Sequence, residues 1–326
     1  MTADEGSDPT DRDPPDTYDV TSWEPRSLLD KLSVGAWEGV VLLTNVVLLL
    51  VAVLILGSQA AIVGFGFVVD PLVAAFTAVS LVPALLIAVD LRRLGLRGWP
   101  ATSLIGGTFV LAMAFAAFAL IPNTVLRARV TAFSTVPLVG TAAFFFLVVA
   151  PVEETTKLLA VRLYGYRSRA MATASHGAVL GAFAGLGFAT TENAFYIATQ
   201  QLGGVGGLAQ ISVTRAVAGP GHVLFSTVAG YYLGLAKDVG RYRGAIAMKG
   251  LLIAAFLHGS YNTLVSFLVD LPAWMPTLEA PIALGGRGWF VIGLSAFYLV
   301  VGTYVFRKLN RFRAVVSATS GGVEAE

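Results

Sequence analysis

Residues 171–197 read MATASHGAVLGAFAGLGFATTENAFYI. Nearly all of these side chains are apolar or small, and the first Asp, Glu, Lys or Arg among them is Glu192. A helix rises about 1.5 Å per residue, so about 18 uncharged residues already reach most of the way across a ~30 Å hydrocarbon core. Backbone amides find no water partners there, so such a segment crosses the bilayer as a helix. The stretch therefore predicts a transmembrane helix.

Seven further apolar stretches of similar length occur, at about residues 39–56, 71–89, 104–121, 138–160, 211–235, 245–268 and 289–306. The composition agrees, because 56% of the 326 residues are hydrophobic and only 13% are charged, against about 25% charged in soluble domains. The chain has no cysteine, which excludes disulfides and thiolate metal sites. We therefore expect an all-α fold, a polytopic membrane bundle of about eight transmembrane helices.

The basic residues are distributed unevenly among the expected loops. If the N-terminus is cytoplasmic, 17 of the 22 Lys and Arg residues fall in cytoplasmic segments. Three lie in the opposite loops (Arg127, Arg129 and Arg287), and two lie within spans (Lys157 and Arg215). An excess of Lys and Arg marks cytoplasmic loops. We expect both termini in the cytoplasm and a multi-pass protein of the cell (plasma) membrane.

The ends of the chain differ from the apolar stretches. Residues 1–30 contain nine of the 20 acidic residues and are rich in proline, so they have too little apolar surface to offset the entropy of ordering. We expect a disordered acidic cytoplasmic tail over residues 1–33, a membrane-embedded domain over 34–313 and a flexible C-terminal tail over 314–326.

Four consecutive spans, the fourth to the seventh, contain polar side chains that are rare in membranes. A charged side chain at the centre of a bilayer costs about 2.5–3.5 kcal/mol, so such groups usually face the interior of a helix bundle. The set comprises Glu153, Glu154 and Lys157 in the fourth span, Glu192 and Asn193 in the fifth, Arg215 and His222 in the sixth, and His258 and Asn262 in the seventh. We expect these side chains to gather in one interior site.

The fifth span also carries a glycine ladder, which consists of Gly177, Gly181 and Gly185 at intervals of four residues. Small residues at this interval lie on one face of a helix and mark close helix–helix contact in membranes. Glu192 continues the same stripe seven residues after Gly185. The ladder therefore predicts that Glu192 faces the bundle interior.

Carboxylates, histidines and an amide in one interior are suited to hydrolysis. A glutamate in a low-dielectric site can act as a general base for water, and His or Asn can donate hydrogen bonds to a developing oxyanion. Glu and His could instead hold a zinc ion that activates water. Two other functions stay open: a transporter or channel with an intramembrane ionisable pathway, and a non-catalytic membrane scaffold that binds a partner through its glycine faces.

The polar groups follow the order Glu153-Glu154-x-x-Lys157, Phe188-x-x-x-Glu192-Asn193, Arg215 with His222, and His258-x-x-x-Asn262. In this order and helix placement they resemble the four motifs of the PrsW family of intramembrane proteases. That family belongs with the CAAX prenyl endopeptidases and the bacteriocin-processing-like membrane proteins. The resemblance covers roughly residues 140–265. The prenyl endopeptidases have His where this chain has Glu192, which favours the PrsW branch.

The resemblance implies an intramembrane endopeptidase. Its partners would be the lipid bilayer and a membrane-anchored protein substrate, such as an anti-sigma-factor-like single-pass protein. No nucleic-acid partner is implied. It implies the catalytic residues Glu153, Glu154, Glu192, His222, His258 and Asn262, supported by Lys157, Phe188, Asn193 and Arg215. Residues 34–313 would then be the protease domain, with its motif core at 140–265.

The resemblance also implies roles within that set. Glu153 or Glu154 would activate water with help from Glu192, while His222 and His258 would bind metal or polarise the carbonyl. Asn262 would complete the oxyanion site. In a metal-dependent form, Zn²⁺ would be bound by Glu192, His222 and His258. Because relatives are described both as metalloproteases and as glutamate-dependent enzymes, the choice between the two mechanisms stays open, as does the choice of Glu153 or Glu154 as the base.

Overall fold

The computed structural model describes residues 70–94, 101–131, 136–238, 243–269 and 288–321, with eight single positions between residues 28 and 46. The chain divides into two units, Met1–Leu54 and Ile55–Glu326. The eight positions of the first unit are helical and exposed. Most of the predicted span at 39–56 and nearly all of the predicted tail at 1–33 lie outside the described residues.

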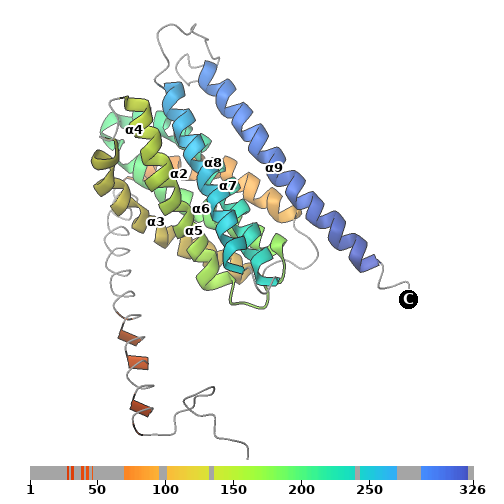
Figure 1. Ribbon diagram of the computed structural model, residues 1–326. Coiled ribbons are helices and arrows are strands. Elements are labelled where there is room, and N and C mark those ends of the chain that lie inside the picture. Colours follow the sequence, from red (N-terminus) through yellow and green to blue (C-terminus); the bar gives the residue numbers. More distant parts are fainter. Residues whose placement is uncertain are drawn as a thin grey trace, which may run out of the picture. The chain divides into compact units, whose positions relative to one another are not determined.

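Every described element of the second unit is a helix (Figure 1). The α-helices are α2 (Pro71–Leu94), α3 (Thr102–Thr131), α4 (Pro137–Phe144), α5 (Ala150–Ala160), α6 (Ala174–Ala198), α7 (Gly204–Asp238), α8 (Arg243–Val269) and α9 (Gly288–Gly321). Two π-helical turns, η1 (Phe145–Val149) and η2 (Val161–Gly165), flank α5, and a 3₁₀ turn, η3 (Gln201–Gly203), precedes α7. The predicted all-α class is confirmed.

Four described helical segments are long and apolar enough to cross a membrane: Pro71–Arg93, Leu138–Gly165, Arg243–Val269 and Gly288–Ala314. They coincide with four of the predicted spans, and the second of them runs from α4 through η2. Helices α3, α6 and α7 coincide with the predicted stretches at 104–121, 171–197 and 211–235. Helix α9 continues to Gly321, past the predicted start of the C-terminal tail at residue 314.

The glycine ladder of α6 lies against the backbone of α7. A Cβ atom added to Gly181 would overlap the carbonyl oxygen of Ser226, and one added to Gly185 would overlap that of His222. In lipid, helix association depends on close van der Waals packing of small residues rather than on a hydrophobic driving force. The ladder therefore fixes α6 and α7 together and places His222 beside the helix that carries Glu192.

We expect Gly181→Ala to lower the thermal unfolding midpoint of the detergent-solubilised protein, because the new methyl group must push α6 away from α7. Overpacking of this kind costs about 1–3 kcal/mol. The matched control is Gly302→Ala in α9, where no described atom lies within 4 Å of an added Cβ. Equal midpoints for the two variants would contradict the close α6–α7 contact.

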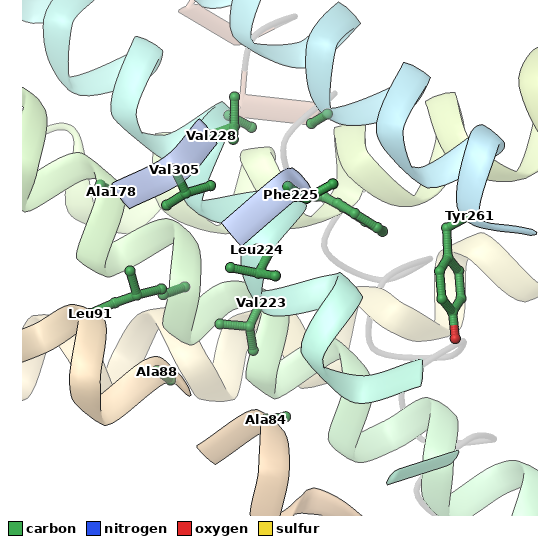
Figure 2. Close-up of a cluster of buried hydrophobic side chains, with 14 of the residues drawn as sticks. Ala84, Ala88, Leu91, Ala178, Val223, Leu224, Phe225, Val228, Tyr261 and Val305 are labelled. Carbon is green, nitrogen blue, oxygen red and sulfur yellow. The ribbon is translucent and has the colours of Figure 1, made fainter. Parts of the chain in front are cut away.

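A buried apolar cluster joins α2, α6, α7, α8 and α9. Figure 2 shows part of it, with Ala84 and Ala88 of α2 near Val223 and Leu224 of α7. The alanines of α2 let that helix approach α7 closely, as small residues do in membrane bundles. Phe225 on the same helix stacks on the ring of His258, at 5.6 Å between ring centroids. The cluster therefore continues directly into the polar site.

Prolines lie within the two helices that carry much of the site. Pro151 comes at the start of α5, immediately after η1, and the wider π turn accommodates a residue that has no N–H and a bulky ring. Pro220 lies inside α7, two residues before His222. The hydroxyl of Tyr298 in α9 donates a hydrogen bond to the carbonyl oxygen of Val217 in this region (2.6 Å). Each proline lies two residues before a site residue, Glu153 and His222 respectively.

Candidate active site

A buried polar cluster forms where α3, α5, α6, α7 and α8 meet. Its members are Asn123 from α3; Glu153, Glu154 and Lys157 from α5; Glu192 and Asn193 from α6; Arg215 and His222 from α7; and His258 from α8. Glu154 is 0% exposed and Lys157 is 1% exposed. Buried charges of this kind persist only when they are paired and hydrogen-bonded.

Lys157 is the cationic centre of the cluster. Its Nζ lies 2.7 Å from Glu154 Oε1, 2.8 Å from His222 Nδ1 and 3.7 Å from Glu153 Oε2, and 4.3 Å from the centroid of the Phe188 ring. An ammonium group only donates hydrogen bonds, so Nδ1 of His222 accepts one from it. The proton of a neutral His222 ring is then on Nε2.

Nε2 of His222 lies 2.8 Å from Oε2 of Glu192 and donates to it. The same carboxylate oxygen accepts a hydrogen bond from the guanidinium group of Arg215, which also donates through Nε to Asn193 Oδ1 (2.8 Å). Asn193 in turn donates to Ser80 Oγ in α2 (3.0 Å). Glu192 is therefore held between a histidine and an arginine, both from α7.

His258 is oriented by Glu154. Its Nδ1 lies 2.9 Å from Glu154 Oε1, and a carboxylate only accepts, so Nδ1 carries the proton. The other oxygen of Glu154 accepts from the hydroxyl of Ser226 (3.3 Å). Both oxygens of Glu154 are thus engaged, and Nε2 of a neutral His258 ring presents a lone pair.

Glu153 has one oxygen that is bonded and one that is not. Its Oε1 accepts a hydrogen bond from Asn123 Nδ2 (3.1 Å). Its Oε2 is buried, has no hydrogen-bond partner among the described residues and lies 3.8 Å from His258 Nε2. Glu153 Oε2 and His258 Nε2 are thus two buried acceptors that face each other, and a proton donor or a cation between them would satisfy both.

The donor set fits a divalent cation. Glu153, His222 and His258 each offer one ligand atom, and these atoms lie within 4.8 Å of one another. Two imidazoles and a carboxylate with an open fourth position are typical of catalytic zinc sites, and a carboxylate on the second nitrogen of a ligating histidine is the usual support. Glu154 supplies that support to His258. Both nitrogens of His222 are hydrogen-bonded, so ligation there would replace one of these bonds.

The structure brings together nearly all residues that the sequence singled out. The group that could hold a cation contains Glu153 where the sequence-based set had Glu192, whose carboxylate instead contacts His222 and Arg215. Asn262 lies one helical turn beyond His258, is partly buried, and forms no hydrogen bond to the cluster among the described residues. Its predicted contribution to an oxyanion site stays a prediction.

Sequence reasoning missed Asn123 and Ser226. Neither is ionisable, and neither shares a motif with the acidic or histidine positions, so no local pattern distinguishes them from ordinary polar residues in a span. Their contacts join positions 30 and 72 residues apart in the chain. Only the packing of α3 against α5, and of α5 against α7, reveals them.

Residues 100–302 match the family model described as PrsW family intramembrane metalloprotease. Among curated proteins, Protease PrsW of Shouchella clausii is 29% identical over 126 residues, which are 38% of this chain and 55% of that protein. Protease PrsW of Geobacillus kaustophilus is 32% identical over 125 residues, 38% of this chain and 52% of that protein. The chain spans about half the length of the first two curated relatives it matches. No solved structure matches it significantly.

Proposed function

The chain belongs to the PrsW family of intramembrane metalloproteases, and from this membership we propose that it is a peptidase that hydrolyses peptide bonds of membrane-anchored proteins. One observation carries the proposal: an unpaired oxygen of Glu153 lies 3.8 Å from an imidazole nitrogen of His258 in a buried site. This arrangement suits activation of water. A scaffold has no need of two acceptors held against each other in this way, and a channel or transporter is separated from a peptidase by the flux measurement below.

The substrate follows from the position of the site. The cluster is enclosed by helices of a multi-pass membrane protein, so a peptide bond reaches it most directly from a segment that is itself anchored in the bilayer. We propose a single-pass protein of the anti-sigma-factor type as the substrate class. We propose residues 34–313 as the membrane-embedded protease domain.

The proposed topology has about eight spans with both termini in the cytoplasm. It is supported by the four candidate spans of the structure and by the coincidence of α3, α6 and α7 with three further predicted stretches. The distribution of Lys and Arg among the loops supports the orientation.

In the proposed mechanism Glu153 is the general base. A water that donates one hydrogen to Glu153 Oε2 and the other to His258 Nε2 keeps an oxygen lone pair free to attack the scissile carbonyl. Oε2 takes the proton and later returns it to the leaving amine. Glu154 has no free oxygen and orients His258, while Lys157 offsets part of the charge of the two adjacent carboxylates.

The remaining cluster residues position the histidines and complete the site. Glu192, held by Arg215, accepts the hydrogen bond from Nε2 of His222 and fixes the orientation of that ring. We assign Asn262 as a donor to the developing oxyanion. If a metal is bound, we propose Zn²⁺ held by Glu153, His222 and His258, where it would supply a Lewis acid that polarises the carbonyl and the water. Glu153 would then be a ligand, and its role as general base belongs to the metal-free form.

Protein reconstituted in liposomes with a tagged single-pass substrate is expected to release two fragments. In the metal-bound form, treatment with a strong chelator is expected to stop this cleavage, and added Zn²⁺ is expected to restore it, because Glu153 and His258 otherwise leave two acceptors unsatisfied. The measurement is the initial rate of fragment release, with metal content of the purified protein determined in parallel.

Ion flux across the same liposomes provides the comparison with the transporter alternative. Flux without cleavage would overturn the peptidase proposal. Cleavage that persists in metal-free protein would remove Zn²⁺ from the proposal and leave Glu153 as a base that acts without a cation.

A further inference from the structure

Helix α3 contributes the side chain of Asn123 to the hydrogen bonds of the site. Its amide nitrogen Nδ2 donates to Oε1 of Glu153 at 3.1 Å. Because a carboxylate only accepts hydrogen bonds, the nitrogen and not the oxygen of the amide must face Glu153. The contact links α3 to the first residue of the Glu-Glu-x-x-Lys motif, and Asn123 itself belongs to none of the four motifs that the sequence singled out.

The hydrogen bond decides which oxygen of Glu153 is available. Oε1 is occupied by Asn123, whereas Oε2 has no hydrogen bond among the described residues and lies 3.8 Å from His258 Nε2. The terminal torsion of a glutamate is broad and roughly two-fold, so packing alone holds it weakly. Nζ of Lys157 lies only 3.7 Å from Oε2, and a small rotation would turn that oxygen into a charge-assisted hydrogen bond.

We propose that Asn123 is a positioning residue: by holding Oε1 of Glu153, it keeps Oε2 directed at His258 and out of the hydrogen-bonding reach of Lys157. The proposal rests on the proposed function, in which Oε2 is the atom that activates water. The amide is well placed for this task, because its own Oδ1 is buried and has no hydrogen-bond partner among the described residues. No recorded hydrogen bond therefore turns the amide away from Glu153.

The test compares three substitutions at this position. Asn123→Ala and Asn123→Asp both remove the donor, whereas Asn123→Gln keeps an amide donor on a longer side chain. We expect kcat for the single-pass substrate to fall about 10–100-fold in the first two, the range seen when supporting residues of a site are removed. KM should stay unchanged, because Asn123 acts through Glu153, and Asn123→Gln should recover part of the lost kcat.

Co²⁺ binding gives a readout that does not depend on cleavage. Glu153 is one of the three side chains whose ligand atoms converge, so a misdirected carboxylate should weaken Co²⁺ binding about 10-fold or more and change the visible absorption bands of the bound ion. The measurement is a titration of the metal-free protein with Co²⁺, for the wild type and for Asn123→Ala.

Thr191→Val is the matched control. It removes another hydrogen bond to α3, from Thr191 Oγ1 to the carbonyl oxygen of Met113 (3.0 Å), without touching Glu153. It should leave kcat and the Co²⁺ titration as in the wild type. If Asn123→Ala also retains the wild-type kcat, or loses activity only through a raised KM, the positioning role is overturned. Failure of the wild type to cleave would refute the proposed function alone, since the Co²⁺ comparison would still decide the role of Asn123. Identical Co²⁺ titrations for the wild type and Asn123→Ala would refute that positioning role.

Discussion

Glu153→Gln is expected to lower the rate of substrate cleavage by about 10³-fold, within the range attributed to a general base. Glutamine has nearly the same shape, and its carbonyl oxygen can still accept the hydrogen bond from Asn123. The amide that replaces Oε2 cannot take a proton from water. The thermal unfolding midpoint should therefore stay close to that of the wild type while the initial rate of fragment release falls.

Two comparisons sharpen this expectation. Glu154→Gln should reduce the rate far less, about 10-fold, because a glutamine oxygen can still accept from His258 Nδ1 and from Lys157. Asp90→Asn, which neutralises an exposed carboxylate in α2, should leave the rate unchanged. A larger loss in Glu154→Gln than in Glu153→Gln would reverse the assigned roles of the two residues.

Lys157→Met is expected to have the largest effect on stability. It removes the cation that lies within 4 Å of two carboxylates that are 3% and 0% exposed. Removing one partner of a buried ion pair typically costs about 3–5 kcal/mol, because the remaining charge stays buried without compensation. We expect a lower thermal midpoint and little folded protein in size-exclusion chromatography, with no cleavage activity.

A second substitution separates charge from packing. In Lys157→Met combined with Glu154→Gln, one of the stranded carboxylates is neutral, so part of the lost stability should return. Activity should not return, because His222 still lacks its hydrogen bond from Lys157. Lys249→Met, at an exposed position of α8, is the control. Equal midpoints for Lys157→Met and Lys249→Met would show that the buried lysine does not stabilise the cluster.

The helices of the membrane unit could be predicted well because each depends on a local property of the chain. The predicted stretch at 71–89 corresponds to α2 at Pro71–Leu94, and that at 245–268 corresponds to α8 at Arg243–Val269. Apolar length alone determines such segments. The glycine ladder likewise predicted a close helix contact, and the structure identifies α7 as the neighbour.

The site could be predicted at the level of residue types but not at the level of atoms. Spacing indicates that Glu153, Glu154 and Lys157 share a face, yet it cannot say which carboxylate keeps a free oxygen. That depends on Asn123 and Ser226, which approach from α3 and α7. The direction in which each carboxylate oxygen points is set by contacts with helices that are distant in the sequence. A pattern within a single sequence therefore cannot predict it.

The π turn η1 has a consequence for the face that α5 presents. A π turn holds one more residue than the α-helical turn it replaces, so the helix after it is rotated by about 100° relative to an uninterrupted α-helix. Leu147 within η1 is 72% exposed, whereas Glu153 in α5 is 3% exposed. A single helical wheel drawn through residues 138–160 would misplace every residue after η1 by about 100°. The one additional residue thus works as a phase shift, and the face that α5 turns to the interior cannot be extrapolated from the face that α4 buries.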